Sequence, residues 1–94
     1  MLTLVANIYA KEDSIEFVKN EILKVIPSVR AEKGCVNYDL HQEINTPNMF
    51  VLYENWESRE DWNAHMDAKH LKAFQEAIKN YVKETTVYQL NKIK

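Results

Sequence analysis

Two side chains three residues apart, Trp62 and His65, are the strongest indication of chemistry in this sequence. Residues at this spacing share one face of a helix, so the imidazole and the indole are expected to lie on the same buried side. A histidine in an apolar pocket can act as a general base or can polarise a bound oxygen. The alternative is a histidine at the edge of the core that only bonds a backbone carbonyl. The residue pattern leaves both interpretations open.

The other two histidines are not expected to form a metal site with His65. His70 follows five residues later, a poor spacing for two ligands on one continuous helix. His41 lies between acidic residues on a predicted strand, which is typical of a surface position. Zinc and iron sites need three or four converging ligands, and the single Cys35 cannot form a thiolate cluster or an internal disulfide. We therefore predict that the chain has no metal site.

Two polar side chains interrupt apolar strands. Asn7 shares a strand face with Val5 and Tyr9, and a buried amide needs partners, so it is either paired internally or available to a ligand oxygen. Glu54 is either a partner in a structural ion pair or an acid catalyst. Aromatic side chains form the core or, alternatively, line a pocket for a flat organic molecule; these are Tyr38, Tyr53, Trp56, Trp62 and Phe74.

Hydrophobic periodicity predicts the elements that position these residues. β-branched and aromatic runs predict strands, and apolar residues that recur every three or four positions from Ile15 to Val29 predict a helix. A second apolar stripe of this kind includes Leu71, Phe74 and Ile78 and continues to Tyr81 or Val82. The predicted strands are residues 2–10, 35–44, 49–56 and 85–93, with one helical region after the first and another after the third.

Capping residues indicate where the helices begin and end. Asp13 or Ser14 is expected to cap the first helix, and Ser58 the second, with Asp61 at the third helical position. Gly34 is the only glycine in the chain. It follows the first helix, where a left-handed residue is commonly needed, so we expect a positive φ there.

The resulting order β-α-β-β-α-β is that of the ferredoxin-like split unit, an α+β fold with an antiparallel sheet. Two helices can cover only one face of a four-stranded sheet. On strand 49–56, Val51 and Tyr53 point opposite to Phe50 and Leu52, so one of these two sets needs a cover that the chain cannot supply. An exposed apolar sheet face normally marks an interface, and we predict a homodimer through it. The sequence leaves open which set meets the partner.

Length and composition narrow the class of protein. The chain has 94 residues, which is sufficient for a single domain at 1–94, and a net charge of −2. Because basic residues form no stripe, we expect no binding to nucleic acid. The first ten residues lack the basic leader of a secretory signal, and no apolar run reaches the length of a membrane span. The expectation is a cytoplasmic protein without a membrane partner.

Four segments of the chain resemble the antibiotic biosynthesis monooxygenase (ABM) domain family. The most specific motifs are Glu-x-Gly-Cys-x-x-Tyr from Glu32, Tyr-Glu-x-Trp from Tyr53, and a helix in which His65, His70 and Phe74 recur. These motifs are specific for the family but not for one activity within it. The resemblance extends over essentially the whole chain, through residues 6–11, 31–40, 50–56 and 64–74.

The resemblance implies a dimeric α/β barrel that oxidises small quinol-like or polyphenolic aromatics with O2 and without a cofactor. A deprotonated phenol can itself donate an electron to oxygen, so the protein need only exclude water, orient the ring and accept a proton. By this resemblance His65 is the catalytic base, and Asn7 and Trp56 orient the substrate oxygen and ring. The other substrate-binding residues would be Tyr38, Tyr53, Trp62, His70 and Phe74.

Other members of this fold indicate alternative functions. Haem-degrading enzymes resemble the chain at Asn7, but they carry tryptophan at the position of His65 and a haem-ligating histidine near Gln75, so this chain departs from them at two positions. Relatives that process a phosphorylated quorum-sensing signal share the inward histidine, which keeps open an isomerase or lyase acting on a small carbonyl compound. A non-enzymatic, dimeric ligand-binding module is the third hypothesis.

Overall fold

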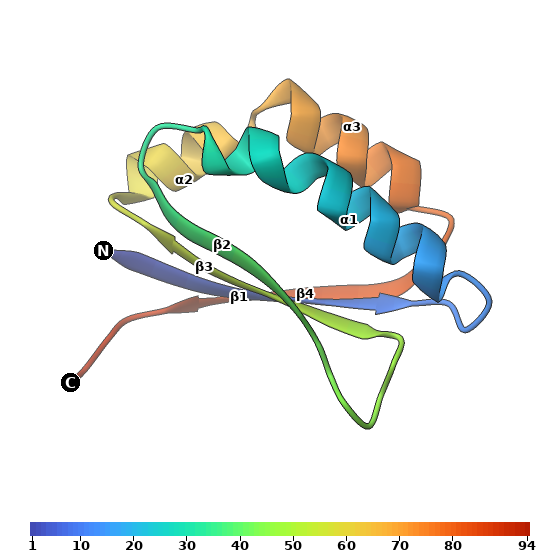
Figure 1. Ribbon diagram of the computed structural model, residues 1–94. Helices are drawn as coiled ribbons and strands as arrows, with labels where there is room; N and C mark the ends of the chain where they lie inside the picture. The colour runs from blue at the N-terminus through green and yellow to red at the C-terminus, as the bar shows by residue number, and fades with distance from the viewer.

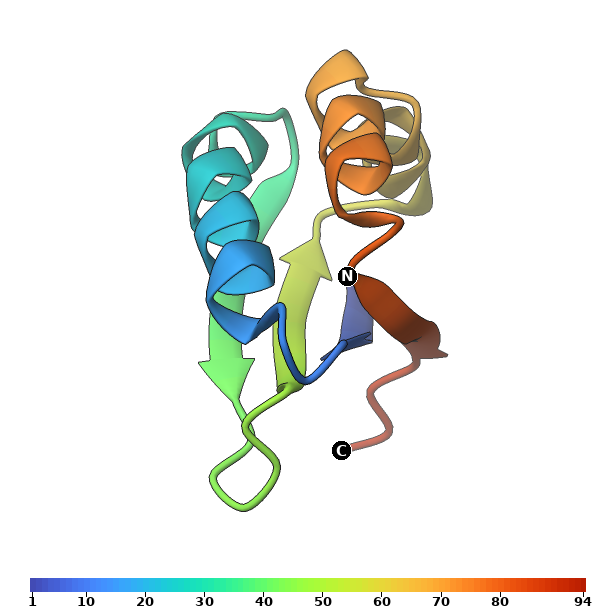
Figure 2. The same ribbon diagram turned by 90° about the vertical axis from the view of Figure 1, so that its right-hand side faces the viewer.

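The computed structural model describes residues 1–94 and shows one antiparallel sheet with all helices on one of its faces (Figures 1 and 2). The strand order is β2-β3-β1-β4, and every neighbouring pair is antiparallel. The predicted ferredoxin-like α+β fold is therefore confirmed. The elements are β1 (Leu2–Ala10), α1 (Ile15–Arg30), β2 (Cys35–Gln42), β3 (Met49–Trp56), α2 (Arg59–Met66), α3 (Lys69–Ile78) and β4 (Val82–Leu90).

The second helical region consists of two helices and not of one. Helix α2 ends at Met66, and Ala68 has an extended backbone with φ −65° and ψ 139° before α3 begins. This extended residue redirects the chain, so residues on either side of it no longer follow the spacing of one continuous helix. The prediction of a single helix was wrong at this point, and the break changes where His70 lies relative to His65.

The last strand begins earlier than predicted. Val82 already pairs with Ala10 at the start of β4, beside an irregularity in the β1 register. Tyr81 precedes the strand, and its ring packs on Phe17 with 4.4 Å between the ring centroids. Neither Tyr81 nor Val82 continues the buried stripe of a helix. Strand β2 also ends two residues before the predicted boundary, at Gln42.

The core lies between the helices and one face of the sheet. Alternate residues of β1 and β3 are buried under the helices, as the two-residue repeat of a strand requires. Helix α1 presents the apolar stripe expected from its periodicity. The buried hydrophobic residues of these three elements are Leu4, Ala6, Ile8, Ala10, Val18, Ile22, Val25, Ile26, Val29, Phe50, Leu52 and Trp56.

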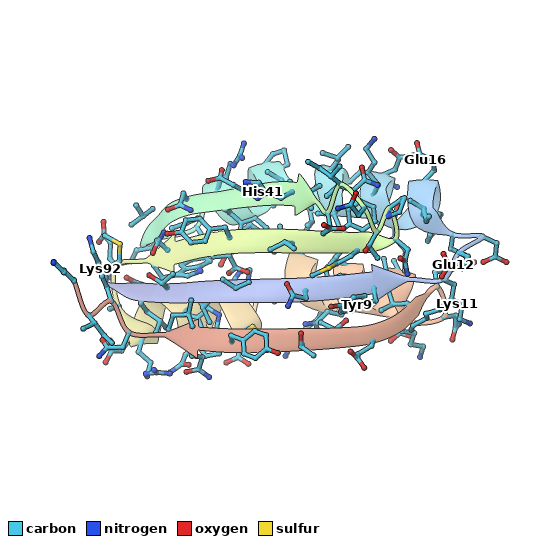
Figure 3. All side chains as sticks on the ribbon, turned by 90° about the horizontal axis from the view of Figure 1, so that it is seen from below. Tyr9, Lys11, Glu12, Glu16, His41 and Lys92 are labelled. Atoms are coloured by element: carbon cyan, nitrogen blue, oxygen red, sulfur yellow. The ribbon has the colours of Figure 1, made fainter.

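The opposite face of the sheet has no helix over it (Figure 3). Phe50 and Leu52 are buried under the helices, whereas Val51 is partly exposed and Tyr53 is exposed. Tyr53 pairs with Val5, which also pairs with Tyr88, so an apolar row crosses β3, β1 and β4. The structure thus answers the question left open by the sequence: Val51 and Tyr53 form the uncovered set.

The two helix starts differ in how they are capped. The Ser58 hydroxyl accepts a hydrogen bond from the Asp61 backbone N–H at 3.1 Å, as predicted. Ser14 is the N-cap of α1, but its side chain makes no capping bond; its hydroxyl donates instead to Asp13 at 2.9 Å. Gly34 has the predicted positive φ, +81°. None of the helices has the length and apolar character needed to cross a membrane.

Candidate active site

A cavity of about 390 Å³ lies between α2, α3 and the sheet, and we call it the His65 cavity. Its volume is within the range of small-molecule sites. Helices and strands both contribute apolar walls, and a few polar side chains, His65 and Glu54 among them, also line it. The apolar lining includes Ala6, Leu52, Leu71, Phe74, Ile78 and Val87.

His65 is the buried side chain of α2, with 2% of its surface exposed. Its ring packs on Trp56 with 4.7 Å between centroids and meets the edge of Tyr38 at 5.7 Å. The inward orientation predicted from the sequence is therefore confirmed. Trp62 also lines the cavity, but the indole that packs on the imidazole belongs to Trp56.

The carboxylate of Glu32 contacts the imidazole of His65. Nδ1 of His65 lies 3.0 Å from Oε2 and 3.2 Å from Oε1 of Glu32, a residue in the connection between α1 and β2. His70 approaches the same carboxylate, with its Nε2 2.6 Å from Oε2. The break between α2 and α3 makes this convergence possible. The sequence-based judgement that the five-residue spacing is poor for two ligands assumed one continuous helix, and the break removes that assumption.

The Glu32 contact determines which nitrogen of His65 is available to a ligand. An ionised carboxylate can only accept hydrogen bonds, so Nδ1 must carry a hydrogen in this pair. A neutral imidazole then keeps its lone pair on Nε2. Because Nδ1 is turned toward Glu32 and the ring lines the cavity, Nε2 is the nitrogen left to accept a proton from a bound molecule.

Glu54 is a second polar group in the lining, and it is buried at 5% exposure. It has no cationic partner; Trp56 Nε1 donates to its Oε1 at 3.0 Å. Burial raises the pKa of Glu54 to about 7, the Trp56 hydrogen bond opposes this rise, and the negative charge of Glu32 adds to it. Glu54 is therefore not the member of an ion pair, which was one of the two sequence-based interpretations.

Tyr38 provides a hydroxyl to the same region. It is 2% exposed, and its residue lines the cavity. Burial, with smaller contributions from the charges of Glu54 and Glu32, raises the pKa of the Tyr38 phenol, so the side chain remains neutral at physiological pH. Burial likewise raises the pKa of the nearby Cys35 thiol, which makes that cysteine a poor nucleophile.

Two of the predicted site residues lie on the other face of the sheet. Asn7 is flanked by Ala6 and Ile8, which are buried under the helices, so its side chain points to the open face. There its Nδ2 donates to Thr86 Oγ1 at 3.3 Å. Tyr53 also lies on the open face and is 43% exposed. The structure does not bring Asn7 or Tyr53 to His65, and the expectation that they hold substrate beside it is not supported.

The remaining predicted residues divide into two groups. Tyr38, Trp62 and Phe74 line the cavity with His65. Trp56 is fully buried behind the imidazole, and His70 contacts Glu32, so both act on His65 or its partner. No group of three or more His, Cys, Asp or Glu side chains is arranged to hold a metal ion.

Comparison with known proteins places this arrangement in a family. The sequence profile of antibiotic biosynthesis monooxygenases matches residues 1–77. The chain belongs to this family. Family membership supports a monooxygenase-type function at the level of the family, acting with O2 on a small molecule.

Individual relatives agree with the family in sequence and fold. The chain is 30% identical to the Escherichia coli protein named "Probable quinol monooxygenase YgiN" over 97 aligned positions, which cover 93% of each protein. The crystal structure of PA3566 from Pseudomonas aeruginosa is 28% identical, with a TM-score of 0.93, over 99% of this chain and 94% of that one. A solved structure from Nitrosomonas europaea is 21% identical, with a TM-score of 0.94 and full coverage of both chains, and this likeness concerns the fold alone.

Sequence reasoning missed the residue that holds the histidine. Glu32 opens the Glu-x-Gly-Cys-x-x-Tyr motif that carried the family resemblance, but no side-chain role followed from its position in a loop. Its separation from His65 is 33 residues, so no local spacing rule connects the two. The only available signal was a charged residue two positions before Gly34 within a family motif.

Proposed function

We propose that this chain is a cofactor-independent monooxygenase that oxidises a small quinol-like or polyphenolic aromatic with O2. The observation that carries the proposal is the His65–Glu32 pair, which occupies Nδ1 of the histidine and leaves Nε2 without a partner in a side chain that lines a largely apolar cavity. The name of the Escherichia coli relative, a quinol monooxygenase, supports the choice of substrate class. The aromatic residues of the lining, Tyr38, Trp62 and Phe74, favour a flat ring in the cavity.

In the proposed reaction, His65 Nε2 removes the proton of a substrate hydroxyl group. The resulting phenolate is electron-rich and donates an electron to O2 without help from a flavin or a metal. One oxygen atom enters the ring and the other leaves as water, with the four electrons for O2 coming from the substrate. The apolar walls exclude water from the phenolate, and the imidazolium formed on His65 is stabilised by Glu32.

Oxygen-electrode turnover with a panel of reduced naphthoquinols and anthrones tests this proposal. We would use metal-stripped protein, the His65→Ala variant, and His41→Ala as the matched control, since His41 is an exposed histidine on β2. Uptake that needs His65 but not His41 is the expected result. Uptake no faster than autoxidation in wild type would overturn the oxygenase proposal, and turnover of a carbonyl compound without O2 would support the isomerase instead.

We also propose that two copies associate through the open sheet face to form a homodimer. The apolar row of Val5, Tyr53 and Tyr88 lies there, and Tyr53 and Tyr88 are 43% and 54% exposed in the single chain. Exposed aromatic residues that form a continuous row favour an interface. Because the face belongs to a sheet, a second copy with the same face offers a surface of matching shape.

A further inference from the structure

The two oxygen atoms of the Glu54 carboxyl group have different surroundings. Oε1 accepts the hydrogen bond of Trp56 Nε1 at 3.0 Å. Oε2 makes no hydrogen bond within the chain and is not fully enclosed, and its residue lines the cavity. An indole N–H can only donate. Because the carbonyl oxygen of a neutral carboxyl group is the better acceptor, the Trp56 bond to Oε1 favours the proton of a neutral Glu54 on Oε2.

A base alone does not complete the reaction proposed above. When O2 has added to a ring carbon, the product forms only after the bond between the two oxygen atoms breaks. The departing oxygen leaves as hydroxide unless an acid protonates it during this step, and hydroxide is a poor leaving group in an apolar cavity. The site therefore needs a proton donor as well as a proton acceptor.

We propose that Glu54 is this donor: its Oε2 gives its proton to the departing peroxide oxygen. This inference rests on the proposed monooxygenase function. Trp56 links the two groups, because its ring packs on His65 at 4.7 Å while its Nε1 bonds Glu54. The acid and the base thus face one cavity from neighbouring positions around one indole.

Protons and electrons balance in this scheme. His65 takes the hydroxyl proton of the substrate and returns it to the peroxide formed on the ring carbon, which gives a hydroperoxide. His65 then removes the hydrogen on that carbon, the C=O bond forms, and the O–O bond breaks. The distal oxygen takes the Glu54 proton and leaves as water. The proton now on His65 restores Glu54 through solvent, and the net reaction is substrate plus O2 to a quinone-type product plus water.

The charges around Glu54 favour this role. Burial raises the pKa of the carboxyl to about 7, and the nearby Glu32 also raises it, so a large fraction of Glu54 is protonated at neutral pH. An acid whose pKa is near the working pH is the most effective general acid. The neighbouring Tyr38 and Cys35 remain neutral because burial raises their pKa values too. Glu32 is the charged neighbour that raises the pKa of Glu54 further, and it is already bonded to His65 and His70.

The experiment compares wild type with Glu54→Gln, and with Glu57→Gln as a matched control that changes an exposed glutamate just after β3. Glutamine can still accept the Trp56 hydrogen bond through its amide oxygen, so the fold is retained, but it cannot transfer a proton. In Glu54→Gln we expect organic product to form about a hundredfold more slowly. Oxygen is still consumed, and peroxide appears in place of water. Product formation at the wild-type rate without peroxide would overturn the assignment.

Infrared spectroscopy gives a readout that does not depend on turnover. Wild type should show the band of a buried, protonated carboxyl group at about pH 5 that is lost by about pH 9, and Glu54→Gln should lack it. The absence of this band in wild type would overturn the proton-donor role by itself. If wild type shows the band but takes up no oxygen, the monooxygenase proposal fails while the protonated Glu54 stands, so the two failures are distinguishable.

Discussion

His65 Nδ1 lies 3.0 Å from Oε2 of Glu32, and this contact joins α2 to the connection between α1 and β2. The side chains of the pair are 3% and 14% exposed, so water competes little for either group. A carboxylate in this position fixes both the tautomer and the orientation of the imidazole. The contact therefore leaves the lone pair of a neutral His65 on Nε2.

Replacing Glu32 by Gln should lower turnover by about a hundredfold. The substitution removes the contact that fixes the tautomer of His65, and a general base contributes at least about a hundredfold to the rate. The glutamine amide can donate to Nδ1 and thereby leave the hydrogen on Nε2. Nitrogen NMR of the imidazole should show a shift from the Nδ1–H toward the Nε2–H tautomer. Unchanged turnover together with an unchanged tautomer would remove Glu32 from the site, and the exposed Glu57→Gln is the control.

Replacing His70 by Gln should affect stability more than substrate binding. His70 Nε2 is 2.6 Å from Glu32, and its side chain is 34% exposed, so we expect a loss of about 1 kcal/mol in the free energy of unfolding. Because His70 does not line the His65 cavity, KM should stay within a few-fold of wild type. Urea denaturation and steady-state kinetics measure the two effects, with His41→Gln as control. A large rise in KM would contradict this placement of His70.

Glu54 should make the protein less stable as the pH rises. Its pKa is about 7 in the folded state and 4.5 for an ordinary carboxyl group, so between these values the folded chain binds more protons than the unfolded one. Below about pH 4.5 the protonated Glu54 contributes about 3 kcal/mol to the free energy of unfolding. This contribution decreases as the pH rises to about 7 and is lost above that pH. Glu54→Gln should flatten this part of the curve of unfolding free energy against pH. Parallel curves for both proteins would contradict the raised pKa.

Replacing Gly34 by Ala should destabilise the protein by about 1–2 kcal/mol from the left-handed backbone alone. Gly34 has φ +81°, and a Cβ there would overlap the side chain of Asp61. Combining the change with Asp61→Ala removes the overlap but not the backbone strain. The double variant should therefore recover only part of the loss, as measured by thermal and urea unfolding. Full recovery would show that the backbone conformation costs nothing.

Replacing Val51 by Lys should convert a dimer into a monomer, because the charge lies on the open sheet face and would be buried without a partner on association. Sedimentation of both proteins measures the change. Leu23→Lys is the control, since Leu23 is an apolar side chain of α1 that is 48% exposed. Wild type that sediments as a monomer, with no effect of Val51→Lys, would end the dimer proposal.

Local sequence patterns were sufficient to predict much of the fold. Strand alternation, the apolar stripe of α1, the Ser58 cap and the left-handed Gly34 each depend on a few neighbouring residues, and each agrees with the structure. The break at Ala68 was not predictable in this way, because the sequence there contains neither proline nor glycine. Tertiary packing of two short helices on one sheet overrides a weak local preference for a longer helix.

The sequence by itself determined that His65 points inward, since its helical spacing from Trp62 depends only on local geometry. Only the tertiary structure decided what surrounds it. Glu32 contacts His65 although 33 positions separate them in the sequence. Asn7 lies on the opposite side of the sheet from the cavity, because the helices cover the face to which its neighbours Ala6 and Ile8 point. Long-range pairing and helix placement fix these relationships, and no short-range pattern encodes them.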